Sequence, residues 1–207
     1  MNIRKVLLIY GLAMTMLFLS VGCGNGNVDN TQENLETEET QETESEFYIE
    51  ITDAAEILNK AWELYAEADR FDIMGGHFAS SVMEMPAKYD LEQTIDLTQM
   101  YCVPEDQIAK LDDAATMIDL YNAGRFTAGA FHITDAEGVN TFCEEMKTQV
   151  VENEWHGEKP EKLLIVKVDE NYVVTVFGRE SLVNEFKQKL EAVYQEMIKT
   201  VVEEKDF

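Results

Sequence analysis

Basic residues are scarce in this sequence. Its 207 residues include 16 Lys and Arg against 41 Asp and Glu, which gives a formal charge of −25. Because proteins bind nucleic acid through clustered Lys and Arg, this imbalance excludes nucleic acid as an expected partner. The acidity indicates a solvated exterior that repels anionic surfaces, and it does not by itself indicate a fold.

Cysteine and histidine are also few, and their spacing excludes the common metal sites. Cys23, Cys102 and Cys143 form no CxxC pair, and the histidines at positions 77, 132 and 156 have no HxxxH spacing. Transition-metal sites need such groupings, so we expect no metal and no cofactor. If Cys23 carries a lipid, Cys102 and Cys143 remain either as a disulfide pair or as two buried free thiols.

The motifs of nucleophilic catalysis are missing as well. The sequence has no GxSxG, no Ser-x-x-Lys and no cysteine among basic residues, so we assign no catalytic residue. Arg125 stands out because basic residues are so few. With Tyr121 and His132 expected nearby in a hairpin, it is a candidate for binding an anionic group. The alternative is that Arg125 only pairs with a surface carboxylate.

A long hydrophobic run occurs at the amino terminus, in residues 6–19. It follows Arg4 and Lys5, precedes small residues, and is shorter than the roughly 20 residues that a membrane-spanning helix needs. Residues 1–23 therefore predict a cleaved signal peptide rather than a spanning helix.

The end of this segment, Leu19-Ser20-Val21-Gly22-Cys23, resembles the lipobox of bacterial lipoproteins. The resemblance implies that Cys23 receives a diacylglyceryl group, and that fatty acids such as palmitate anchor the chain. Two or three acyl chains hold a protein on a membrane, at about 0.8 kcal/mol for each buried methylene. We expect the chain on the outer side of the cytoplasmic membrane, at the cell surface. The alternative is a plain secretory signal with an incidental cysteine.

Residues 24–46 contain eight acidic residues, no basic residue, and only Val28 and Leu35 as aliphatics. Such a composition cannot form a core and predicts a disordered acidic linker, with an average span of about 25–30 Å. Residues 47–207 are then expected to form one domain.

Periodicity predicts the elements of that domain. Residues 53–69 show helical spacing after a possible capping box of Asp53 and Glu56. Residues 71–103 give no clear pattern. Two hairpins are predicted, 115–121 with 126–133 and 163–168 with 172–177, with Gly124 supplying an unusual dihedral in the first turn. A helix with Thr134 and Glu137 as capping box follows the first hairpin, and a long helix over 182–201 follows the second.

This order predicts an α+β fold. An amphipathic helix precedes a ββα-ββα arrangement, in which an antiparallel sheet of about four strands carries helices on one face.

Three segments suggest a family. Met100-Tyr101-Cys102-Val103-Pro104-Glu105-Asp106, the run 126–133 passing into Thr134-Asp135-Ala136-Glu137, and Asn171-Tyr172-Val173-Val174 occur in this order. They resemble, over roughly residues 90–200, the domain-of-unknown-function 4358 family of Firmicutes lipoproteins. The resemblance implies a lipid anchor and an acidic linker, and it brings no established activity and no catalytic residues.

These features favour a non-enzymatic module that binds an envelope protein or a small ligand at the membrane. An exposed apolar patch on a sheet face without helices would support that function. The alternatives are a small envelope enzyme with an unidentified site, or a purely structural envelope component.

Overall fold

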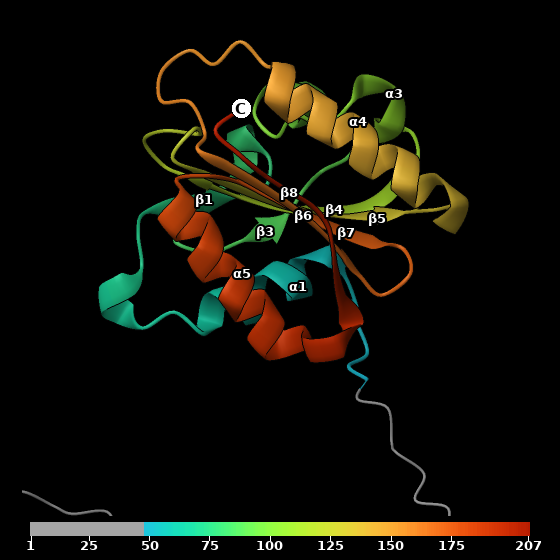
Figure 1. Ribbon diagram of the computed structural model, residues 1–207, viewed down its shortest axis with the longest axis horizontal. Coiled ribbons are helices and arrows are strands. Elements are labelled where there is room, and N and C mark those ends of the chain that lie inside the picture. The colour runs from blue at the N-terminus through green and yellow to red at the C-terminus, as the bar shows by residue number, and fades with distance from the viewer. Residues whose placement is uncertain (1–47) are drawn as a thin grey trace, which may run out of the picture. The chain divides into compact units, whose positions relative to one another are not determined.

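The computed structural model describes residues 48–207, which share one antiparallel sheet of eight strands and five α-helices (Figure 1). The strands are β1 Ile73–Gly75, β2 Val82–Met83, β3 Ala87–Lys88, β4 Leu111–Asp119, β5 Phe126–Ile133, β6 Lys162–Val168, β7 Tyr172–Gly178 and β8 Ile198–Lys205. The helices are α1 Ala54–Glu63, α2 Ile95–Gln99, α3 Glu105–Ile108, α4 Val139–Glu152 and α5 Glu180–Tyr194. The predicted α+β class and antiparallel sheet are confirmed, while the expected count of about four strands was too low.

The strands follow the order β2-β1-β4-β5-β7-β6-β8, and β3 pairs with β4 beside β1. The two predicted hairpins form the centre of this sheet, as β4 with β5 and β6 with β7. Strands β1, β2 and β3 come from the region without a clear pattern, and β8 comes from the segment predicted as helix.

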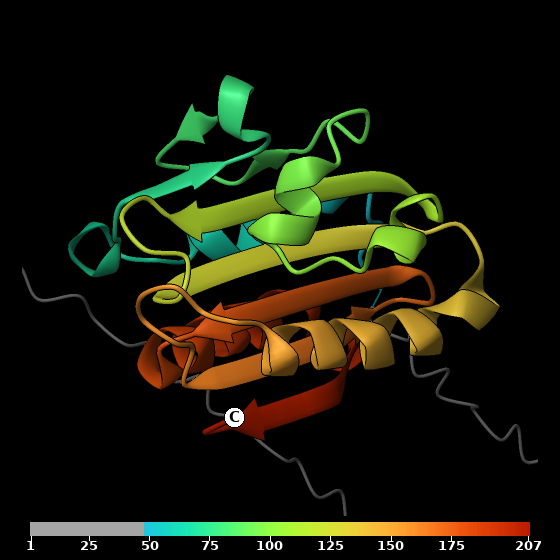
Figure 2. The same ribbon diagram turned by 90° about the horizontal axis from the view of Figure 1, so that it is seen from above.

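Helices cover both faces of the sheet, so the expectation of one covered face was wrong. α1 and α5 pack on one face, whereas Leu97 of α2, Ile108 of α3 and Phe142 of α4 belong to the core on the other (Figures 1 and 2). Strand β6 shows why both faces are covered. Leu164 packs in the core with α1 and α5, and Leu163 packs in the core with α2, α3 and α4. A strand buried on both faces is apolar at nearly every position, which is the pattern of Leu-Leu-Ile-Val in β6.

The turn of the first hairpin differs from its prediction. Gly124 is absent from the residues with positive φ, so it does not supply an unusual dihedral. It is needed for space, since a Cβ atom at this position would lie 1.6 Å from the carbonyl oxygen of Glu158. The glycine lets the 153–161 loop pack directly on the hairpin turn.

Two of the predicted helix starts have different outcomes. Asp53 caps α1 as expected, with its carboxylate accepting from the backbone N–H of Glu56 at 2.8 Å. The second capping box was wrong. Asp135, not Thr134, accepts from the N–H of Glu137, and the Thr134 hydroxyl donates to the carbonyl of Lys110 instead.

The final helix is shorter than predicted. Gln195 adopts a left-handed φ of 46°, which ends α5, and a short 3₁₀ turn, Gln195–Met197, leads into β8. Residues 198–205 then pair along β6. The β-branched run Thr200-Val201-Val202 favours this strand, although its spacing also fits a helix.

Candidate functional site

The structure separates the three residues expected to form one site. Tyr121 lies in the β4–β5 turn and Arg125 at its end, but His132 lies near the other end of β5, opposite Tyr172. Seven residues along a strand span about 23 Å. The expected proximity of His132 to the other two was therefore wrong.

Arg125 forms an ion pair with Asp119, the last residue of β4, across the β4–β5 turn. Its Nη1 donates to Oδ2 of Asp119 at 2.7 Å, and the Asp119 side chain has no solvent exposure. The other carboxylate oxygen of Asp119 accepts from the backbone N–H groups of Tyr121 and Asn122, both at 3.0 Å. Asp119 is thus satisfied on both oxygens, and Arg125 neutralises a buried carboxylate rather than the surface carboxylate considered from the sequence.

Tyr121 is 75% exposed, and its hydroxyl donates to Asp72 at 3.1 Å, which raises the pKa of the phenol. Next to Asp72, a groove of about 320 Å³ lies between the end of α1 and β1. The residues that line it are Trp62, Glu67, Arg70, Phe71, Asp72 and Glu84. The Arg70 guanidinium lies 5.7 Å from the centre of the Trp62 ring, so an aromatic ring and both signs of charge meet there.

His132 belongs to a second group of polar residues, the polar cluster, near the start of α1. The ring of His132 bonds through Nδ1 to Asp112 and packs on Tyr172 with ring centres 4.6 Å apart. Asp112 has no partner on β5, because the register shifts between Leu111 and Asp113. Such a bulge re-aims its side chain, here toward the histidine.

Asp113 and Lys88 complete the polar cluster. Asp113 accepts from the backbone N–H of Ala54 at 2.6 Å and pairs with Lys88 at 3.0 Å, which raises the pKa of the lysine. Burial first, and then the charge of Asp113, raises the pKa of Tyr172 to about 12. These contacts hold the first turn of α1 against β3 and β4.

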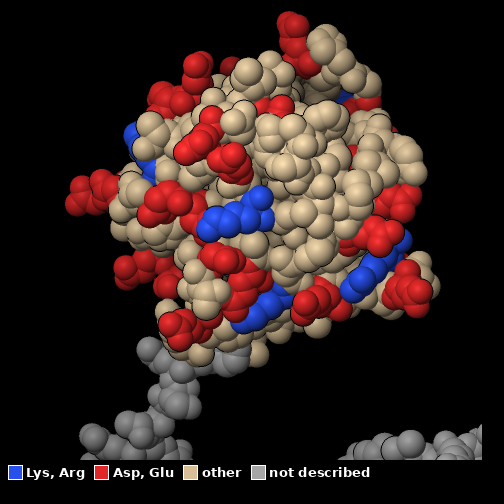
Figure 3. All heavy atoms as spheres, turned by 180° about the vertical axis from the view of Figure 1, so that it is seen from behind, with Lys and Arg blue, Asp and Glu red and all other residues tan. Residues whose placement is uncertain are grey.

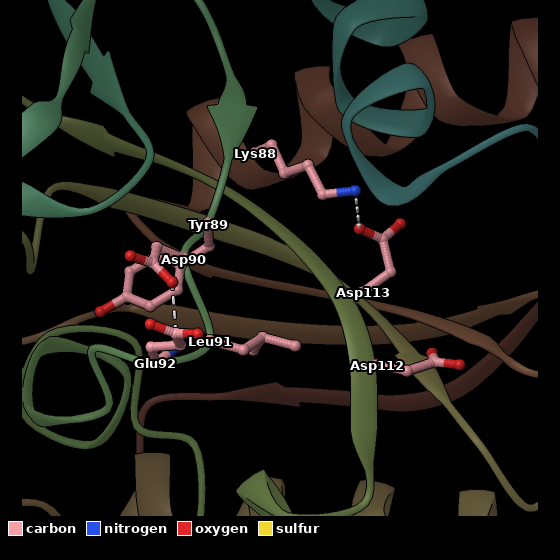
Figure 4. Close-up of a pocket in the computed structure, with 7 residues that line it drawn as sticks. All are labelled: Lys88, Tyr89, Asp90, Leu91, Glu92, Asp112 and Asp113. Atoms are coloured by element: carbon pink, nitrogen blue, oxygen red, sulfur yellow. Dashed lines mark hydrogen bonds and ion pairs between the residues drawn. The ribbon is translucent and has the colours of Figure 1, made fainter.

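A groove of about 400 Å³ runs beside the polar cluster, lined by residues 88–92, Asp112 and Asp113. Figure 4 shows Asp90 and Glu92 on one side of β4 and Asp112 projecting on the other, so these carboxylates do not converge. Within residues 48–207, no three His, Cys, Asp or Glu side chains are grouped so that they could hold a metal ion. The groove is therefore an acidic surface, and its one lysine, Lys88, is already paired with Asp113.

A third feature was not expected from the sequence. Between β1 and β3 the chain makes an excursion, residues 76–86, that stands beyond the sheet edge, on the side opposite β8 (Figure 2). Five of the nine large apolar side chains exposed in the described residues lie on it or beside it. These five, here called the edge patch, are Phe78, Val82, Met83, Met85 and Ile95.

Contacts locate four of these residues. The backbone N–H of Phe78 donates to Asp96, next to Ile95, at 3.2 Å. Val82 and Met83 form β2, the two-residue edge strand that pairs with β1. A signal for this surface was present in the sequence, because residues 73–83 contain no Asp, Glu, Lys or Arg although 28% of the chain is charged.

The two cysteines in the described residues are free and buried. Burial raises the pKa of Cys102 to about 12 and that of Cys143 to about 11. The sequence left open either a disulfide or two free thiols, and the structure contains two free thiols. Cys102 also has a left-handed φ of 57°, at a turn where glycine is the usual residue.

The chain matches no protein-family model, no curated protein and no solved structure. The resemblance to the family named above therefore stays a prediction. The predicted signal peptide 1–23, the predicted lipidation of Cys23 and the predicted linker 24–46 all concern residues outside the described part of the chain. None of the helices within residues 48–207 combines the length and hydropathy that a bilayer crossing requires.

Proposed function

We propose that this chain is a membrane-anchored lipoprotein of the bacterial cell envelope, and that its folded domain is a non-enzymatic binding module for another envelope protein. The anchor rests on the order of basic, apolar and small residues before Cys23. The binding role rests on the edge patch, which is the observation that carries the proposal.

The edge patch supports binding because its side chains are large, apolar and exposed at or near one edge of the sheet. Within residues 48–207, Phe78 and Ile95 are 62% and 69% exposed. Single exposed apolar residues are normal, but a contiguous group bordered by polar residues marks an interaction surface. Met and aromatic residues are also enriched at protein interfaces.

The excursion is held firmly enough to present such a surface. The Trp62 indole donates to the carbonyl of Glu84 at 3.0 Å, and the N–H of Glu84 donates to the carbonyl of Ile73 at 2.8 Å. A preorganised surface loses less conformational entropy when a partner binds.

The polar cluster supports a structural role for the remaining candidate residues. Asp113 binds the first backbone N–H of α1, and Asp112 binds His132. Each of these two aspartates thus has a hydrogen-bond partner within the domain.

The anchor is tested by metabolic labelling with a fatty acid, followed by fractionation, in the wild type and in Cys23→Ala. We expect label in the wild-type membrane fraction and neither label nor membrane retention in the variant. Cys143→Ala is the matched control and should keep both. Equal labelling of Cys23→Ala and the wild type would refute lipidation at this residue.

The binding role is tested in cells by placing a photoreactive phenylalanine analogue at position 78. The matched control carries it at Val201, an exposed position on β8 at the other edge of the sheet. We expect a discrete cross-linked envelope protein with the probe at position 78 and not at 201. No cross-link at 78, or the same products at both positions, would refute a binding surface at this edge.

A further inference from the structure

The groove of about 320 Å³ between the end of α1 and β1, here called the arginine groove, contains a basic residue without a carboxylate partner. The described part of the chain has three arginines. Arg125 and Arg179 each pair with a carboxylate, whereas the Arg70 guanidinium has no ion-pair partner among the described residues. Acidic residues outnumber basic ones by 41 to 16, and Figure 3 shows many acidic and few basic side chains on the visible face. An arginine without a carboxylate partner is therefore unexpected in this chain.

Arg70 is positioned by an aromatic surface. Its guanidinium lies 5.7 Å from the centre of the Trp62 ring, and the Trp62 indole is itself fixed by donating to the carbonyl of Glu84 at 3.0 Å. Phe71 packs edge to face on the Trp62 ring, with ring centres 5.3 Å apart. A guanidinium that contacts an aromatic ring through cation–π attraction keeps its N–H donors for other partners. Arg70 can therefore bind a carboxylate through two parallel hydrogen bonds.

Three carboxylates line the same groove. They come from separate segments, because Glu67 begins a 3₁₀ turn, Asp72 precedes β1 and Glu84 follows β2. Among the described residues, the carboxylates of Glu67 and Glu84 have no hydrogen-bond or ion-pair partner, and that of Asp72 accepts only from the Tyr121 hydroxyl, at 3.1 Å. The arginine groove thus contains both signs of charge, and none of its carboxylates pairs with the guanidinium.

The backbone of Glu84 holds one wall of the groove in a fixed conformation. Its φ of 67° lies in the left-handed region, which is uncommon for residues other than glycine. Two hydrogen bonds keep it there, since its N–H donates to the carbonyl of Ile73 at 2.8 Å and its carbonyl accepts from Trp62. Uncommon backbone conformations that are held by the surrounding structure occur at ligand-binding sites.

The charges of the arginine groove disfavour a ligand of a single sign. An anion at Arg70 would lie in a groove lined by three carboxylates, and a cation at those carboxylates would meet the guanidinium. A ligand that carries both charges avoids either repulsion. The volume of about 320 Å³ suits a small molecule, because ligand pockets span roughly 300–1,000 Å³. The partly exposed ring of Phe71 offers an apolar surface to the rest of the ligand.

We propose that the arginine groove binds a small zwitterion of the amino acid class, which combines a carboxylate, an ammonium group and an apolar side chain. The carboxylate pairs with Arg70, and the apolar side chain lies on Phe71. The ammonium group lies against Glu67, Asp72 and Glu84. This small-molecule site goes beyond the proposed binding of an envelope protein and does not depend on it.

The test is isothermal titration calorimetry of the full chain with three probes that share a phenyl group. L-Phenylalanine carries both charges, 3-phenylpropionate carries only the carboxylate, and 2-phenylethylamine carries only the ammonium group. We expect saturable binding of phenylalanine that weakens as the NaCl concentration rises, because the charge pairs are partly exposed to water. Each probe with a single charge should bind about tenfold more weakly or worse.

Variants of Arg70 test the carboxylate contact. Arg70→Gln should weaken phenylalanine binding about tenfold or more and remove the preference for phenylalanine over 2-phenylethylamine. Arg70→Lys should recover only part of the affinity, because lysine keeps the charge but cannot form two parallel hydrogen bonds. The control is Lys199→Gln, which removes a positive charge from an exposed position on β8 at the other edge of the sheet and should leave binding unchanged.

Variants of the acidic residues test the ammonium contact. Glu67→Gln/Glu84→Gln should weaken phenylalanine binding and reduce the preference for phenylalanine over 3-phenylpropionate. Glu152→Gln/Glu154→Gln removes the same charge from exposed positions on and after α4 and should do neither. The thermal unfolding of all variants should match that of the wild type, since each replaced side chain is exposed, and this measurement separates lost binding from misfolding.

Three results would overturn the inference. Absence of saturable phenylalanine binding to the folded full chain would remove the site. Equal affinity for phenylalanine and both single-charge probes would show that only the phenyl group is recognised. Equal phenylalanine binding by Arg70→Gln and the wild type would show that the carboxylate does not contact this arginine.

Discussion

Replacing Arg125 by methionine should reveal whether this residue stabilises the domain, because it is the charged partner of Asp119. The Asp119 side chain has no exposure, and Arg125 is 31% exposed at its side chain. Removing one partner of a buried pair typically costs 3–5 kcal/mol. Since two backbone N–H groups still bind Asp119 and solvent reaches the pair, we expect the lower end, about 3 kcal/mol.

The assay is urea unfolding followed by circular dichroism. With a denaturant slope of about 2 kcal/mol per molar, the midpoint should fall by about 1.5 M. A double-mutant cycle with Asp119→Asn isolates the pair, and Arg125→Met should cost much less when Asp119 has already been neutralised. Lys147→Met is the control, because its partner Glu204 is 40% exposed and such surface pairs contribute little.

Two outcomes would refute this reasoning about Arg125. A loss below about 1 kcal/mol would show that the buried carboxylate does not depend on the guanidinium. An equal loss with and without Asp119→Asn would assign the effect to the packing of the Arg125 guanidinium over the Phe71 ring.

The other predictions concern sterics, pH and thiols. Gly124→Ala should destabilise the domain by about 2 kcal/mol or more, because its Cβ would overlap a backbone oxygen; Gly138→Ala, whose Cβ would meet only an ordinary contact at 3.7 Å, should unfold near the wild-type urea midpoint. Glu203 bonds to two lysines that lower its pKa from 4.5 to about 2. Because the pKa of Glu203 is lower in the folded state, the stability that Glu203 contributes is present above pH 4.5 and lost as the pH falls toward 2. The urea midpoint of Glu203→Gln should therefore depend less on pH between 4.5 and 2 than that of the wild type. Cys102 and Cys143 should react with Ellman's reagent at pH 8 only after urea unfolds the chain; rapid reaction of both in the native protein would contradict their burial.

The central hairpins were predictable because local signals agree with the tertiary structure. β-Branched runs flank Asp169-Glu170-Asn171, and Asp169 does adopt a left-handed φ of 62°. The final strand was not predictable from spacing, because Val193, Met197 and Val201 continue the helical period past Gln195. Only the unpaired edge of β6 makes a strand the better solution there, and that edge is a property of the whole sheet.

The site was less predictable than the fold. The short elements of the 71–103 region pair with distant strands, such as β1 with the end of β4, so no local period exists. Tyr121 and Arg125 were placed correctly in one turn, but the distance to His132 depends on strand length rather than on residue type. The absence of charge in residues 73–83 was the one available signal for the edge patch.

The place of β8 in the sheet has a consequence for biogenesis. β6 has β7 on one side and β8 on the other, so its second row of backbone hydrogen bonds forms only when residues 198–205 are free to pair. During synthesis from the amino terminus, the Leu-Leu-Ile-Val segment of β6 therefore keeps an open, aggregation-prone edge until residues 198–205 emerge. The pairing of β6 is thus completed only by residues 198–205, and a chain that stalls before them would leave an apolar strand available to other molecules.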